Sequence, residues 1–82
     1  MIAAQSPTAA QHQYSVIVTY DPESGLYLAD VPALGFITEG FSVEHAFEMA
    51  EEAIAGRLET MAAHGQSIPV EEHPAQVRQV VV

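Results

Sequence analysis

The sequence has no cysteine and no tryptophan, and it has two basic residues, Arg57 and Arg78, against 11 acidic ones. Without cysteine the chain can form neither disulfides nor thiolate zinc sites. The formal charge of −9 argues against direct binding to nucleic acid or to anionic membranes, because both need cations that neutralise phosphate. A basic protein partner is favoured, although acidity that serves solubility alone explains the composition equally well.

Long hydrophobic runs are also missing. No stretch reaches the roughly 18 apolar residues that span a bilayer, and the N-terminus lacks the charged and apolar segments of a signal peptide. We therefore expect a cytoplasmic protein. Eighty-two residues allow one domain with a small core. Residues 1–12 are small and polar, and we expect a disordered arm there, followed by a single domain at 13–82.

Alternating apolar and polar residues predict strands. The first covers 13–20, with Tyr14, Val16, Val18 and Tyr20 on one side. The turn-forming residues of 21–25 lead to an antiparallel second strand at 26–31, and 36–39 forms a short third strand. The tail 76–82, QVRQVVV, is rich in valine and predicts a last strand, parallel to an earlier one.

Between the third strand and the tail, the spacing predicts one long helix that begins after an N-cap at Ser42 and ends at Gly65. Position 45 holds His45 where a capping box has Glu or Gln, so we expect half of that motif. The helix has three faces. The expected core stripe consists of Val43, Phe47, Ala50, Ile54, Leu58 and Met61. The acidic stripe, our candidate partner-binding surface, consists of Glu44, Glu48, Glu51, Glu52 and Glu59.

The third face of the helix carries small and uncharged residues, including Met49 and Gly56. The resulting order, βββαβ, is an α+β fold with one mainly antiparallel sheet and one long helix on one face. No second helix covers the other face of the sheet, on which we place Ile17, Tyr27 and Val31. We therefore expect homo-oligomers. The candidate interface residues are Met49, Gly56, Val80 and Val82.

The order of several short motifs resembles the HicB family of antitoxin domains. The matching pieces are GLYLADVPALGFITEG at 25–40, SVEHA at 42–46, EAI at 52–54 and GQSIP at 65–69. This resemblance implies a partial ribonuclease H-like βββαβ fold and a role in neutralising a small, basic, RNA-cleaving toxin of the HicA type. Such antitoxins usually carry a C-terminal DNA-binding module, and because the sequence up to Val82 shows none, we expect no operator binding by this chain alone.

Catalysis finds little support in the sequence. A two-metal nuclease needs converging carboxylates, but the strand at 13–20 contains none, and Asp21, Asp30 and Glu39 are scattered. The four histidines show no metal-ligand spacing. We expect no catalytic, cofactor or metal site, and we expect Glu71 and its neighbours to be a solvated linker. For Arg57, either its stem packs over apolar surface or its head reaches a carboxylate of another element.

These observations predict an antitoxin-like protein-interaction domain that binds a basic HicA-type toxin and also itself. The alternative is an orphan structural or regulatory domain that only self-associates. In that case the acidic stripe serves solvation, and reversing its charge leaves every interaction unchanged.

Overall fold

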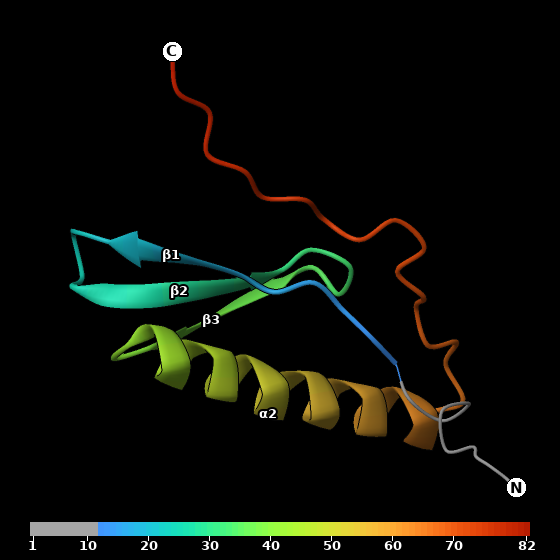
Figure 1. Ribbon diagram of the computed structural model, residues 1–82. Coiled ribbons are helices and arrows are strands. Elements are labelled where there is room, and N and C mark those ends of the chain that lie inside the picture. Colours follow the sequence, from blue (N-terminus) through green and yellow to red (C-terminus); the bar gives the residue numbers. More distant parts are fainter. Residues whose placement is uncertain (1–11) are drawn as a thin grey trace, which may run out of the picture.

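The computed structural model describes residues 12–82, which form a three-stranded antiparallel sheet with one helix against it (Figure 1). The strands are β1 (Ile17–Asp21), β2 (Leu26–Val31) and β3 (Phe36–Gly40), adjacent in that order, and the helix is α2 (Val43–Ala63). The predicted α+β class, with an antiparallel sheet and one long helix, is confirmed. The arm expected at 1–12 lies outside the described residues except for His12.

The strands follow from two short connections. At the first, Asp21 caps the turn: its carboxylate accepts hydrogen bonds from the Glu23 amide at 3.3 Å and from the Ser24 hydroxyl at 2.8 Å. Strand β2 has the predicted bounds, and β3 is one residue longer than expected. Strand β1 begins at residue 17 and not at 13, with Ile17 opposite Asp30. Strand β2 ends at Val31, and the next residue, Pro32, has no N–H to donate, so Ser15 and the residues before it have no strand residue opposite them.

Both predicted ends of α2 are confirmed. The Ser42 hydroxyl accepts a hydrogen bond from the His45 amide at 3.0 Å. At the other end Gly65 has a φ of 67° and the Gln66 amide bonds the Met61 carbonyl at 2.9 Å, which together form a Schellman motif. The expectation of half a capping box is confirmed, because the Ser42 side chain accepts the His45 amide but His45 does not accept the Ser42 amide. His45 Nδ1 instead accepts the amide of Phe41, the residue before the N-cap, at 2.9 Å.

The core is small and lies between α2 and the middle of the sheet. Its buried residues are Ala29, Val31, Leu34, Ala46 and Ala50. The small side chains of α2 allow the helix to approach the sheet closely. The approach also requires glycine at position 40, because a Cβ there would lie 2.5 Å from the Ala46 amide nitrogen. The start of α2 therefore rests directly on the end of β3.

This close approach rotates α2 relative to the predicted stripe. Ala50 is buried, and Ile54, Leu58 and Met61 are half-buried. Phe47 and Val43, which were expected in the core, remain 41% and 44% exposed. The prediction failed there because helical spacing shows which residues share a face of the helix, but not which part of that face lies against a small sheet.

The opposite face of the sheet carries alternating apolar and polar residues. The register places Ile17, Asp30 and Ile37 in one row, and Thr19, Leu28 and Glu39 in the next. Two residues that we expected there were misplaced, because Tyr27 and Val31 pack toward α2 with the core. Ile37 is 61% exposed. Within residues 12–82 no element covers this face.

The strand predicted at 76–82 is wrong. This segment, which we call the tail (Gln76–Val82), has no regular secondary structure and is exposed throughout. Figure 1 shows it leaving the sheet instead of joining it. A run of valines favours a strand only where another strand supplies hydrogen-bond partners, and the chain turns away before the tail reaches one.

Candidate interaction surface

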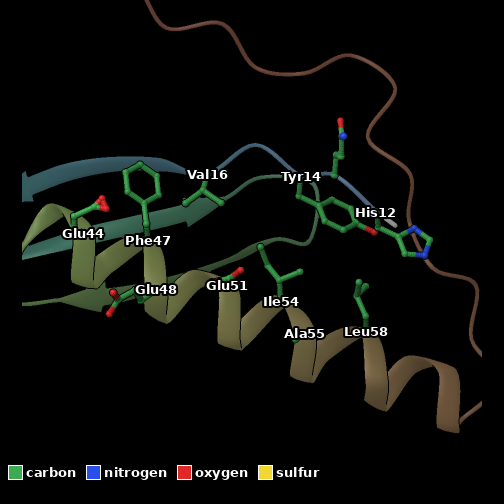
Figure 2. Close-up of a pocket in the computed structure, with 11 residues that line it drawn as sticks. His12, Tyr14, Val16, Glu44, Phe47, Glu48, Glu51, Ile54, Ala55 and Leu58 are labelled. Carbon is green, nitrogen blue, oxygen red and sulfur yellow. The ribbon is translucent and has the colours of Figure 1, made fainter. Parts of the chain in front are cut away.

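A groove lies between α2 and the segment that leads into β1 (residues 12–16), and we call it the β1 groove. Helix α2 packs mainly against β3 and β2 and has few contacts with β1. The groove has a volume of about 690 Å³. Its apolar lining comes from two segments and consists of Tyr14, Val16, Phe47, Ile54, Ala55 and Leu58. Figure 2 shows Phe47, Ile54 and Leu58 pointing from α2 toward Val16 and Tyr14.

Glutamates lie along the helical side of this groove. Glu44, Glu48 and Glu51 are exposed and line it, at a spacing that keeps them on one side of α2 (Figure 2). The other two glutamates of the predicted acidic stripe, Glu52 and Glu59, are exposed but do not line the groove. The structure therefore divides the acidic stripe into a groove set and an outer set.

This arrangement combines two kinds of attraction. An apolar partner surface that fills the groove would cover Phe47 and Ile54, and each fully buried side chain of this size contributes about 1.5–3 kcal/mol. The three carboxylates attract cations over a distance of about 8–10 Å at ordinary ionic strength. The sequence pointed to the glutamates but did not indicate that Tyr14, Val16 and Phe47 line a groove, because all three have the periodicity of core residues.

The four predicted interface residues do not form one surface in a single copy. Met49 is half-buried on α2, and Gly56 is exposed on the same helix with no atom of another element within 4 Å of a Cβ built there. Val80 and Val82 lie in the tail, which is well separated from α2 in Figure 1.

Glu71, expected in a solvated linker, instead ties the chain after α2 to the start of the sheet. Its carboxylate accepts the Ser15 amide at 2.8 Å and the Ser15 hydroxyl. That hydroxyl oxygen accepts the Ala75 amide at 3.0 Å, and the Tyr14 hydroxyl donates to the Pro69 carbonyl. We call these five residues the clamp. Sequence spacing could not reveal it, because its members lie 55–60 residues apart.

The clamp shifts two ionisation equilibria. The hydrogen bonds from the side chain and the amide of Ser15 hold the pKa of Glu71 below its ordinary value, because they stabilise the ionised carboxylate. Burial raises the pKa of Tyr14, and the negative charge of Glu71 adds to that rise. Both shifts favour a clamp made of an ionised glutamate and a protonated tyrosine at neutral pH.

Arg57 lies over apolar surface, as in the first of its two predicted alternatives, but its guanidinium takes part in the contact instead of remaining in water. Its guanidinium carbon lies 5.1 Å from the centroid of the Phe36 ring, and Nη1 donates to the Leu34 carbonyl at 3.3 Å. It therefore covers an aromatic ring and a loop carbonyl. The structure shows no carboxylate partner for it among the described residues.

The acids considered for catalysis are not brought together. Asp21 belongs to its turn, and Asp30 and Glu39 lie in different rows of the sheet face away from α2. In the part of the chain from 12 to 82, no three histidine or carboxylate side chains are grouped as a metal site would require. Over the same residues, no helix has both the length and the apolar character of a membrane span.

Comparison of the chain with known protein families, with curated proteins and with solved structures gave no match.

Proposed function

We propose that this chain is a protein-interaction domain that binds a small basic protein in the β1 groove, acting by binding and not by catalysis. The observation that carries the proposal is the placement of three carboxylates along an apolar groove in a chain of charge −9. The partner segment that fits this chemistry is amphipathic, with an apolar side for Phe47 and Ile54 and basic residues for the glutamates.

The charge of this surface affects how a basic partner binds. Negative potential around the groove speeds the encounter with a basic partner and fixes its orientation, whereas the apolar contacts slow its release. A protein that cleaves RNA needs a cationic surface for phosphate, and an acidic domain that covers such a surface competes with RNA. The proposed partner class is therefore a small, basic, RNA-cleaving toxin, of the kind that the resemblance to HicB domains implies.

The finer fold class belongs to the same proposal. The order β1, β2, β3, α2, with adjacent antiparallel strands and one helix on one face, agrees with the first four elements of a partial ribonuclease H-like fold. An antitoxin-like role also implies that the protein works in the cytoplasm, where RNA-cleaving toxins have their substrate.

The test compares two charge reversals that are matched in size. The groove variant is Glu48→Lys with Glu51→Lys, and the control is Glu52→Lys with Glu59→Lys. Both change the net charge by the same amount on the same helix, and only the first alters the groove. The probes are the small basic proteins encoded beside this chain and a synthetic leucine–lysine peptide with helical spacing, measured by calorimetry.

We expect the groove variant to weaken binding at least about tenfold, equivalent to about 1.4 kcal/mol, and the control to change it much less. Binding of the unaltered chain should weaken as salt rises, because exposed charges are screened. Equal losses in both variants would show that net charge alone attracts the probes. Absence of any binding by the neighbouring basic proteins would contradict the antitoxin-like role.

A further inference from the structure

The tail is the most exposed apolar segment of the described chain. Val77, Val80, Val81 and Val82 are 76%, 74%, 96% and 115% exposed. Four valines in seven residues favour extended structure strongly, because β-branched side chains pack well on a pleated sheet. An isolated segment of this kind buries none of its apolar surface, and its backbone groups have no ladder partner within residues 12–82.

The sheet offers the complementary feature. With the order β1–β2–β3, strand β1 pairs on one side with β2, and on its outer side it has no strand partner within residues 12–82. An unpaired edge presents free N–H and C=O groups to any extended segment that can align with it. The seven residues of the tail extend about 23 Å at 3.3 Å each, which is enough to cover the five residues of β1.

The clamp determines where the tail begins. The Ala75 amide is bonded to Ser15, two residues before β1, so the tail starts at the β1 side of the sheet and not at the β3 side. From there it runs away from its own sheet (Figure 1). One copy therefore displays a free strand-forming segment and a free edge close to each other, and does not join them.

We propose that the tail of one copy adds as a fourth strand to the outer edge of β1 in a second copy, and that the second copy returns the same contact. Because the contact is reciprocal, the exchange is self-complementary and closes at two copies. Charge supports this occupant. Arg78 is the one charged side chain of the tail and Asp21 the one charged side chain of β1. The pairing segments carry little of the net charge of −9, which otherwise opposes self-association.

The exchange is independent of the β1 groove, because it uses the edge of the sheet and a segment that does not line the groove. It also assigns a place to two of the predicted interface residues, Val80 and Val82. Met49 and Gly56 have no part in it.

The experiment is sedimentation equilibrium on the full chain over about 1 μM to 1 mM, the range of weak to moderate association. The tail variant is Val80→Lys with Val82→Lys. Its matched control is Gln66→Lys with Val70→Lys, which adds the same charge at exposed positions outside the tail. Circular dichroism establishes that both variants keep the fold.

We expect the unaltered chain and the control to form two-copy species, and the tail variant to raise the dissociation constant at least about tenfold. Hydrogen exchange should slow with rising concentration at β1 amides and not at β3 amides. A chain that stays monomeric throughout would overturn the proposal. A two-copy species that survives the tail variant, or concentration-dependent protection confined to β3, would overturn it as well.

Discussion

Gly40 is the position where a single added methyl group tests the packing of α2 most sharply. It is buried, and a Cβ there would lie 2.5 Å from the Ala46 amide nitrogen, 2.7 Å from Ala46 Cα and 2.8 Å from the His45 carbonyl carbon. All three atoms belong to the backbone of the first turn of α2, so no side chain can move aside. Gly40 is not among the glycines with positive φ, so the cost of Gly40→Ala is steric.

The size of the effect follows from these contacts. Ordinary contacts begin at 3.4 Å, so the start of α2 would have to retreat by about 0.9 Å. Overpacking of a well-packed site costs about 1–3 kcal/mol, and the loss of chain freedom in the unfolded state returns about 0.4–1 kcal/mol. We expect a net loss of about 1–2 kcal/mol. For a domain of this size that lowers the melting temperature by roughly 4–16 °C.

Gly56 provides the matched control. It lies inside α2, is exposed, and has no atom of another element within 4 Å of a Cβ built there. Gly56→Ala should therefore stabilise the protein by about 0.5–1 kcal/mol through helix propensity alone. Both variants are measured by urea unfolding followed by far-UV circular dichroism. If Gly40→Ala is as stable as the unaltered chain while Gly56→Ala gains stability, then α2 does not rest on β3 as described.

Substitutions at three further positions test the connections. Glu71→Gln should release Ser15, seen as faster amide exchange there. The pKa of Glu71 is lowered in the folded state, so the stability that its carboxylate contributes is present at neutral pH and is lost as the pH falls below the ordinary range of a glutamate. An acid titration of the Ser15 amide signal checks this. An unchanged signal would contradict it. Asp21→Ala should cost about 0.5–1.5 kcal/mol in urea unfolding and Asp21→Asn less, since asparagine keeps an acceptor; equal losses would argue against the turn cap. His45→Ala should lower stability by about 0.5–1 kcal/mol, whereas His45→Gln, which keeps an acceptor, should restore most of it.

Local signals predicted the local structure well. Ser42 and Gly65 determine the ends of α2, and the turn residues around Asp21 determine the first hairpin, because these effects act within a few residues. The bounds of β2 followed from alternation and from Pro32. The failures concern partners that are distant in the sequence. Neither the exposure of Phe47 nor the clamp at Glu71 could be predicted, because both depend on how α2 lies across the sheet.

The candidate site was predicted in part. The acidic residues of α2 could be identified from composition and helical spacing, but the structure divides them, with Glu48 and Glu51 at the groove and Glu52 and Glu59 outside it. The apolar part of the site has the same alternation as a core strand. Tyr14 and Val16 are therefore indistinguishable from core residues until the tilt of the helix toward β3 is known.

The β1 groove can be tested most directly by mapping amide chemical shifts of the full chain during titration with the synthetic leucine–lysine peptide. The proposal predicts that the largest changes fall on Tyr14, Val16, Phe47 and the neighbouring turns of α2, and that they decline in the Glu48→Lys, Glu51→Lys variant. Changes centred on Ile37 and the open face of the sheet, or changes that persist unaltered in that variant, would contradict it.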